Sequence, residues 1–393
     1  MKKFLIFFSV LIAAFSMLIF SCSNLIEDLR LHQPQEDNPS SEPEPESEPE
    51  NPPEEEDEPL ITVLPEGTDG TGGPDETYVH FGYWPQTIKA ASVTVDESET
   101  KVMGAHTYYL GSDGEYYAKL SANPDGDSDG ICSDGTVLVA GQEYYFKVEP
   151  IKWRVLNTDA EGGKLLLAEK VLTANVPYYD YTSSIDWTTF EETNVDRNIN
   201  SETIYASNYE HSAIRAYLNG LSYTVRPHDE TERVSNAYVG KGFLQTAFTA
   251  EERGKILTTS VDNSGTSTSD SLGRLLKSDG TDPDYPDYTC ANTDDKIFLL
   301  SEREITTAEY GFEVLGDPFA SAPSPTRIRP ATDFSKANHV EHTSSGAYWW
   351  LRSPQPRNSN FVYRVSPDGD SVEFWPVGDK TRGVCPALYV NLD

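Results

Sequence analysis

Short runs of alternating apolar and polar residues lie between residues 78 and 171, and this period of two predicts β-strands. Pro150 separates two of these runs. Because proline has no N–H to donate to a strand ladder, we expect a bend there. The strands predicted in this part of the chain cover residues 78–83, 107–109, 115–119, 143–148, 151–156 and 164–171.

Helical periodicity and capping residues mark fewer segments. The clearest helix begins at Ser212, where Ile214 and Leu218 stand four residues apart and share one face. Two more starts match a capping box, in which Ser or Thr precedes Glu by three residues, and another lies near Thr332. These starts are Thr249 with Glu252, Ser301 with Glu304, and Thr332 followed by Phe334 and Ala337.

Apolar runs return near the C-terminus and predict strands at 349–351, 361–365, 371–375 and 387–391. Pro367, Asp368, Gly369 and Asp370 stand between two of these runs, and this composition predicts a hairpin turn. Two or three main helices among many short strands indicate an α+β fold with antiparallel sheets. We expect this folded domain to occupy residues 76–393.

The first 21 residues have the layout of a secretory signal. Lys2 and Lys3 precede an apolar run at 4–20, and Ser21 and Cys22 follow it. The ending Ile-Phe-Ser-Cys resembles a bacterial lipobox, which predicts that Cys22 is lipidated and anchors the protein to a membrane. An ordinary signal peptide or an uncleaved anchor helix is the alternative interpretation.

Residues 34–59 hold twelve acidic residues and eight prolines. A segment of this composition repels itself and has little apolar surface to bury, so we expect a disordered linker within residues 22–75. Fully extended, it would reach on the order of 80 Å at about 3.1 Å per residue. It would hold a folded domain away from a membrane; an acidic partner-binding tail is the other interpretation.

The chain of 393 residues carries a formal net charge of −34. Phosphates would be repelled and no basic patch is interleaved with aromatic residues, so we expect no nucleic-acid partner. Cys132, Cys290 and Cys385 follow Cys22 and are too few for a disulfide framework. One bridge could form in an oxidising compartment, although buried free thiols are the simpler expectation.

The C-terminal tail consists of two apolar blocks, GAYWWLRSP at 346–354 and RGVCPALYV at 382–390, around a chemically varied segment. Tyr, Trp and Arg dominate binding hot spots, and Asn and Ser provide adaptable hydrogen bonds, so residues 355–377 are predicted to bind a ligand. Under the competing interpretation, every second residue packs into the sheet, as we expect for Val362 and Val365. The predicted ligand-binding residues are Arg357, Asn358, Asn360, Phe361, Tyr363, Arg364, Ser366, Asp368, Asp370, Glu373, Phe374 and Trp375.

Asp125, Asp127 and Asp129 match the first half of a calcium loop, but Thr136 stands where its bidentate Glu belongs. These residue types also form ordinary turns, so calcium is only a candidate, and no other cofactor is indicated. No G-x-S-x-G elbow and no convincing Cys–His pair are found, and the chain is not predicted to be an enzyme.

Several other polar residues are expected to be structural. His80 is interpreted as a packed strand residue, whereas His339 and His342 match no zinc signature and are expected to be solvated. Arg215 and Arg352 fall inside apolar segments. Each is therefore predicted to form an ion pair with an Asp or Glu.

Seven segments within residues 80–392 resemble a family of bacterial surface lipoproteins with a C-type-lectin-like fold. The core of that fold is like that of formylglycine-generating enzymes. Within the family, the nearest resemblance is to variable proteins whose C-terminal region is diversified by a retroelement. The segments are HFGYWPQTI (80–88), YYFKVEPIKWRVL (144–156), NYEHSAIRAYLNG (208–220), GFLQTAFTAEE (242–252), DKIFLLSEREI (295–305), GAYWWLRSP (346–354) and RGVCPALYVNL (382–392).

The resemblance implies a lectin-like domain displayed at the outer surface of a bacterial cell envelope. Its C-terminal region would bind a protein or a glycan without covalent chemistry, and its side chains would vary on a constant frame. Two other functions stay open. One is a carbohydrate-active or oxidative enzyme of the same fold, and the other is a structural envelope protein that makes lateral contacts.

Overall fold

The structure, a computed structural model, describes residues 59–65, 77–180, 197–199, 202–225, 233–265, 288–314, 323–355, 359–370 and 373–392. These residues belong to one compact unit, Glu58–Asp393. The predicted signal, Cys22 and the acidic segment up to residue 58 lie outside the described residues, as do Arg357 and Asn358.

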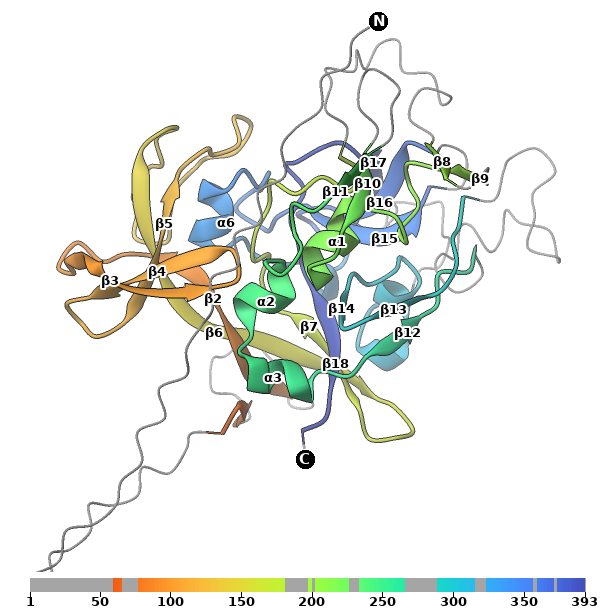
Figure 1. The fold of residues 1–393 in the computed structure, drawn as a ribbon, viewed down its shortest axis with the longest axis horizontal. Coiled ribbons are helices and arrows are strands. Elements are labelled where there is room, and N and C mark those ends of the chain that lie inside the picture. Colours follow the sequence, from red (N-terminus) through yellow and green to blue (C-terminus); the bar gives the residue numbers. More distant parts are fainter. Residues whose placement is uncertain are drawn as a thin grey trace, which may run out of the picture. The chain divides into compact units, whose positions relative to one another are not determined.

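A nine-stranded antiparallel sheet is the largest element of this unit (Figure 1). Its long strand β6 (Glu143–Thr158) pairs along one edge with β2 (Tyr78–Ile88). Along the other edge it pairs first with β5 (Tyr116–Ser121) and then with β7 (Lys164–Ala168), so that the sheet forks. The remaining order is β1 (Ile61–Leu64) beside β2, then β4 (His106–Gly111) and β3 (Val95–Met103) beyond β5, and β18 (Ala387–Val390) and β14 (Ile297–Phe298) beyond β7.

Four smaller sheets complete the strands of the described residues. Three are two-stranded, and the fourth contains the strands of the C-terminal segment. The two-stranded sheets are β8 (Arg197–Ile199) with β9 (Glu202–Ile204), β10 (Tyr223–Val225) with β11 (Arg233–Ser235), and β12 (Thr259–Val261) with β13 (Thr293–Asp295). The fourth sheet is β15 (Trp349–Pro354), β16 (Phe361–Val365) and β17 (Glu373–Pro376).

The helices of the described residues are short, and none is long and apolar enough to cross a membrane. Helix α1 begins where the Ser212 hydroxyl accepts the Arg215 N–H at 3.1 Å, and it ends at Gly220 in the left-handed conformation. The predicted starts at Thr249 and Thr332 are likewise confirmed. The helices are α1 (Ala213–Asn219), α2 (Phe243–Ala247), α3 (Ala250–Lys255) and α6 (Asp333–Ala337), and 3₁₀ turns lie at Glu304–Thr306, Ala308–Tyr310 and Pro325–Arg327.

This mixture of antiparallel sheets and short helices confirms the predicted α+β class. The described residues hold four α-helices rather than two or three. Helix α2 was missed because Gly242 precedes it and no Ser, Thr, Asp or Asn side chain caps it. Strand β1 lies before residue 76, where the domain was expected to begin, because it is a four-residue apolar run beside an acidic segment.

Strand β6 runs through Pro150 without ending, whereas two separate runs were predicted. Pro150 lies between Lys147, the last partner of β5, and Trp153, the first partner of β7. A proline is tolerated there because neither neighbouring strand on that edge requires its missing N–H. The proline therefore marks the fork in the sheet.

Aromatic side chains join the main sheet to the helices that pack on it. Trp84 of β2 lies 4.8 Å from Phe243 of α2, measured between ring centroids. Phe146 of β6 lies 5.5 Å from Phe334 of α6. Such tilted and edge-on ring contacts stabilise a core beyond the area they bury.

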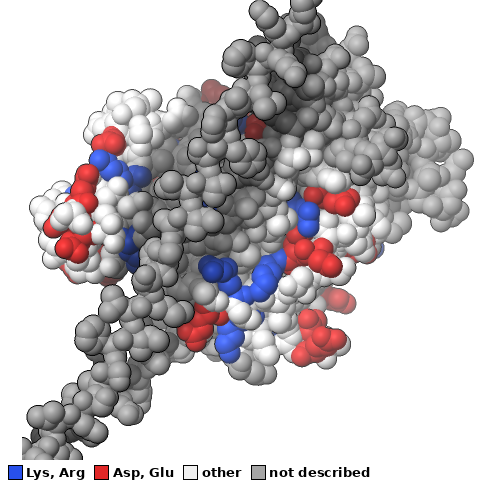
Figure 2. Space-filling model, in the orientation of Figure 1, with Lys and Arg blue, Asp and Glu red and all other residues white. Residues whose placement is uncertain are grey.

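The surface charge of the described unit is mixed. On the face drawn in Figure 2, Lys and Arg side chains are bordered by Asp and Glu side chains. Within the unit, Cys132 and Cys385 are buried free thiols, as the simpler of the two expectations has it, whereas the free thiol of Cys290 is half-buried. The Cys385 thiol donates a hydrogen bond to the Ala168 carbonyl at 3.2 Å.

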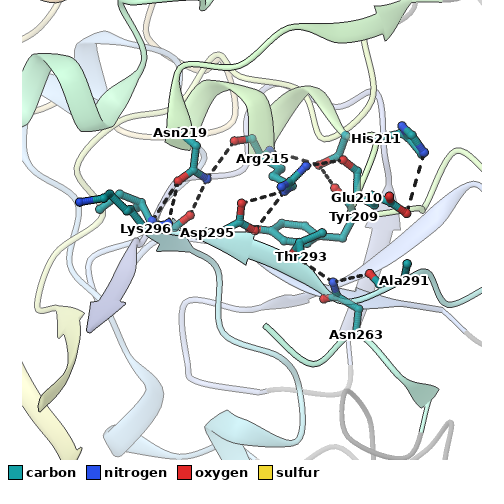
Figure 3. Close-up of polar contacts among 12 residues, drawn as sticks. Tyr209, Glu210, His211, Arg215, Asn219, Asn263, Ala291, Thr293, Asp295 and Lys296 are labelled. Carbon is teal, nitrogen blue, oxygen red and sulfur yellow. Dashed lines mark hydrogen bonds and ion pairs between the residues drawn. The ribbon is translucent and has the colours of Figure 1, made fainter. Parts of the chain in front are cut away.

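Two arginines within apolar segments form ion pairs, as predicted. The Arg215 Nε of α1 lies 2.9 and 3.0 Å from the two carboxylate oxygens of Asp295 on β13 (Figure 3). Arg352 of β15 meets both oxygens of Glu304, with Nη2 donating to Oε1 at 2.8 Å. These pairs connect a helix to a small sheet and the C-terminal sheet to a 3₁₀ turn.

We predict that Arg352→Met lowers the free energy of unfolding by about 3–5 kcal/mol, because Glu304 then loses its buried partner. Lys119→Met is the matched control: Lys119 Nζ lies 3.0 Å from both Glu97 and Glu143 on a more exposed part of the sheet. Its loss should cost less than about 1 kcal/mol. Urea denaturation measures both, and equal stability of the two variants would contradict the structural role of Arg352.

His106 should make the stability depend on pH. Burial lowers its pKa from 6.5 to about 4, so the folded state holds the ring neutral while the unfolded chain takes up a proton. The contribution is complete above pH 6.5 and is lost as the pH falls from 6.5 towards 4, by about 2 kcal/mol between pH 7 and 5. Denaturation of His106→Phe should show about that much less loss, and identical pH profiles would disprove this assignment.

Candidate ligand-binding surface

The C-terminal sheet has β16 as its central strand, between β15 and β17. Residues directly opposite each other in neighbouring strands project to the same face, and successive residues alternate between faces. The register therefore sorts the side chains into two sets. The opposite pairs are Trp349–Val365, Trp350–Arg364, Val362–Trp375, Tyr363–Phe374 and Arg364–Glu373.

The two apolar blocks on either side of the varied segment hold β15 in place. The Trp350 N–H donates to the Gly383 carbonyl at 3.0 Å, and the Gly383 N–H donates to the Tyr348 carbonyl at 2.8 Å. A Cβ at Gly383 would lie 2.1 Å from a methyl group of Val171, so the close approach requires glycine. Trp349, Trp350 and Leu351 are fully buried, as expected for anchors of a frame.

One face of the sheet carries an aromatic group formed by Phe361, Tyr363 and Phe374. The ring of Phe374 stands edge-on to both others, with centroids 5.7 Å from Phe361 and 6.4 Å from Tyr363. Phe374 is 44% exposed, whereas Tyr363 is 4% exposed. The group therefore passes from the interior to the surface, and its outer edge offers apolar contact area.

The other face carries a group of arginines and aromatic rings that we call the arginine cluster: Tyr348, Arg364, Trp375 and Arg382. The Arg364 guanidinium lies 4.0 Å from the ring centroids of both Tyr348 and Trp375. Arg382 lies 4.5 and 4.6 Å from the same two rings. Each guanidinium thus gains two cation–π contacts.

Carboxylates surround the arginine cluster. Glu373 accepts from Arg364 Nε at 3.1 Å, and Asp379 accepts from the Trp375 indole at 2.6 Å. Glu341 pairs with Arg382. Burial, followed by the neighbouring charge of Arg382, lowers the pKa of Arg364, and burial raises the pKa of Tyr348. The cluster therefore combines guanidinium groups stacked on aromatic rings with hydrogen bonds and ion pairs to carboxylates.

The predicted hairpin turn joins β16 to β17, and its tip is fixed to another part of the chain. Gly369 has a φ of +83°, and a Cβ there would lie 2.0 Å from the Ser324 carbonyl oxygen. Arg327 Nε donates to the Gly369 carbonyl at 2.8 Å. Only glycine combines this conformation with so close an approach.

The predicted ligand-binding residues divide by burial. Asp368 and Phe374 are exposed, and Phe361, Glu373 and Trp375 are half-buried. The other five described members are buried inside the unit, and Val362 and Val365 are fully buried as expected. Those five are Asn360, Tyr363, Arg364, Ser366 and Asp370.

Sequence reasoning missed Tyr348 and Arg382, because both stand in blocks assigned to the core. Arg382 is 1% exposed, so its role depends on contacts that no spacing reveals. A charged residue at the start of an otherwise apolar block was the one available signal. It would have indicated a buried partner, as it did for Arg352.

The structure brings the Asp125–Asp129 loop against the chain that precedes β15. His342 is buried rather than solvated, which corrects the expectation for this residue. Its ring Nε2 lies 3.1 Å from Asp129 Oδ1, and its backbone N–H donates to the Ser128 hydroxyl. Asp125 accepts from the N–H of Asp127. Within the described residues, no group of three His, Cys, Asp or Glu side chains could hold a metal ion, so the calcium interpretation gains no support.

The fold and this surface define an α+β protein with a buried frame and a small C-terminal sheet whose aromatic edge reaches the solvent. The chain belongs to the family described as a domain of unknown function, DUF6273, whose model matches residues 161–392 and so more than half of the chain. The match spans β7 to β18 and includes the whole C-terminal sheet. Comparison with curated proteins and with solved structures found no match.

We predict a sharp difference in stability between two opposite residues of this sheet. Tyr363→Ala should lower the free energy of unfolding by about 3–5 kcal/mol, because it empties a buried aromatic site. Phe374→Ala should cost only about 1 kcal/mol, because its ring is half in solvent. Chemical denaturation compares the two, and a larger loss for Phe374 would show that this strand belongs to the core.

Proposed function

We propose that this protein is a lipid-anchored lipoprotein of the bacterial cell surface that binds a protein or glycan ligand through its C-terminal sheet. The observation that carries the proposal is the aromatic edge formed by exposed Phe374 and half-buried Phe361, set on strands whose frame is fully buried. A rigid frame keeps the entropy cost of ordering a binding surface low. Aromatic side chains at such an edge provide large contact areas.

The arginine cluster supports the same proposal from the opposite face. Trp375 and Tyr348 are half-buried, and both lie against guanidinium groups that hold them in place. Aromatic rings and arginines are the side chains most enriched at binding hot spots. A ligand with apolar and charged groups, such as a protein surface or a glycan, matches this composition.

The sequence resemblance adds the location and the fold. The segments quoted above resemble those of lectin-like surface lipoproteins, and the nearest resemblance is to the treponemal variable protein. On this basis, Cys22 is the lipid anchor, residues 34–59 are a stalk and the folded unit is C-type-lectin-like. Exchange of side chains by a retroelement would require a near-identical template repeat and a reverse-transcriptase gene beside the coding sequence.

The binding proposal is tested with a variant that alters only exposed and half-exposed residues of the surface: Phe361→Ala, Asp368→Ala and Phe374→Ala together. The full chain is screened against a glycan array and a panel of purified serum proteins. We expect selective binding by the native protein and a loss of about tenfold or more in the variant, because hot-spot aromatic residues dominate affinity.

The control variant removes exposed apolar side chains from other elements, Val102→Ala on β3 and Val234→Ala on β11. It should bind like the native protein. Thermal melts establish that both variants are folded. If the native chain binds nothing selectively, or if the surface variant binds as tightly as the control, this surface does not bind the ligand.

A further inference from the structure

A cavity lies at the fork of the main sheet. Pairing of β6 with β5 ends at Lys147 and pairing with β7 begins at Trp153, so the stretch between them has no described strand on that edge. The chain that follows β7 crosses this gap: the Glu169 N–H donates to the Lys152 carbonyl at 3.1 Å. The space that remains has a volume of about 280 Å³, and we call it the fork cavity.

The opposite strand is irregular at the same place. The register of β2 against β6 shifts between His80 and Tyr83 and again between Pro85 and Thr87, which are β-bulges. Bulges redirect side chains and are frequent beside functional sites. Gln86 lies in the second shift, and its amide donates to the carbonyls of Glu149 at 3.3 Å and Pro150 at 2.9 Å. Hydrogen bonds between β2 and β6 therefore fix this wall of the cavity.

Titratable residues from three segments line the fork cavity. Lys152 and Glu149 come from β6, His80 from β2, and Lys170 from the crossing segment. Lys152 Nζ lies 3.9 Å from the centroid of the Tyr78 ring, which fixes the position of the ammonium group. Burial lowers the pKa of His80, so the ring is neutral near pH 7 and can accept or donate a hydrogen bond.

The balance of charge in the lining selects the ligand. Two lysines and one glutamate leave one positive charge in a chain whose formal net charge is −34. Glu169 stands beside Lys170, and its Oε1 lies 3.6 Å from Arg154 and 3.8 Å from Arg329, which compensate its charge. A monoanion would neutralise this single positive charge. A dianion would leave an excess negative charge beside Glu149.

We propose that the fork cavity binds a small carboxylate of the size of an acidic monosaccharide. Lys152 and Lys170 would pair with the carboxylate, since charge-assisted hydrogen bonds to a carboxylate are among the strongest that a side chain makes. Glu149, Gln86 and His80 would bind hydroxyl groups. The volume lies just below the usual range for ligand pockets, about 300–1,000 Å³, and matches a ligand of a single ring.

The site shares no lining residue with the C-terminal sheet, so it does not depend on the function proposed above. The cavity is lined by residues from both sides of position 161, where the family match begins. The N-terminal strands therefore do more than extend the sheet. They complete a second binding site with the family domain.

Titration of the purified full chain with sodium glucuronate, sodium phosphate and glucose tests this site by isothermal calorimetry or saturation-transfer NMR. We expect saturable binding of glucuronate, weaker binding of phosphate and none of glucose. Lys152→Gln and Lys170→Gln should each weaken glucuronate binding by about tenfold, because each removes one charged hydrogen-bond donor.

Lys164→Gln is the control, since Lys164 lies on β7 and donates to Thr158 at 2.8 Å outside the cavity. It should bind glucuronate like the native chain. If the Lys152 variant fails to fold, the exposed Lys170 position still decides the question. Absence of saturable glucuronate binding, a preference for phosphate, or equal weakening by the control would each overturn the proposal.

Discussion

Hydrogen bonding along both edges of β6 holds the described unit together, because this one strand is shared by every part of the main sheet. Its first half joins β2 to β5, β4 and β3, and its second half joins β2 to β7, β18 and β14. A strand with two partners exposes no edge of its own except at the fork. The Trp153 indole also donates to the Phe81 carbonyl at 2.8 Å, which ties β6 to β2 through a side chain.

The same ladder reaches the C-terminal sheet through a short series of contacts. Strand β18 pairs with β7. Gly383, which lies just before β18, accepts a hydrogen bond from the backbone N–H of Trp350 on β15. Arg352 adds a second connection, since its guanidinium donates to the Leu299 carbonyl at 2.9 Å beside the Glu304 pair. The candidate surface thus rests on backbone hydrogen bonds and one buried ion pair, and both kinds of interaction are directional.

Local patterns revealed the elements whose own residues decide their structure. The N-cap at Ser212, the capping box at Thr249 and the turn around Gly369 were all found, because each depends on residues within four positions of one another. The fork at Pro150 and the register shifts of β2 were not found. They depend on which strands become neighbours. These partners stand outside the local pattern, from Ala168 opposite Trp153 at the fork to Gln86 bonded to Pro150 across 64 residues.

The candidate site shows the same division. Their apolar side chains correctly placed Val362 and Val365 in the core, yet alternation could not show that Tyr363 and Arg364 are buried as well. A strand covered on both faces has no polar side, so a period of two carries no information about exposure. The stacking of Arg364 between Tyr348 and Trp375 joins three segments, and the composition of any one of them reveals only that a charge lies among aromatic residues.

The clamped hairpin tip limits how this surface can evolve. Gly369 packs closely against the Ser324 carbonyl, and Arg327 donates to the Gly369 carbonyl, so an inserted or deleted residue in the turn would disturb both contacts. One inserted or deleted residue would turn every side chain of a strand to the opposite face, exchanging the aromatic edge for the charged one. Point substitutions leave the backbone path intact. If the hairpin binds a ligand as proposed, its specificity would change through replacement of side chains and not through changes in loop length.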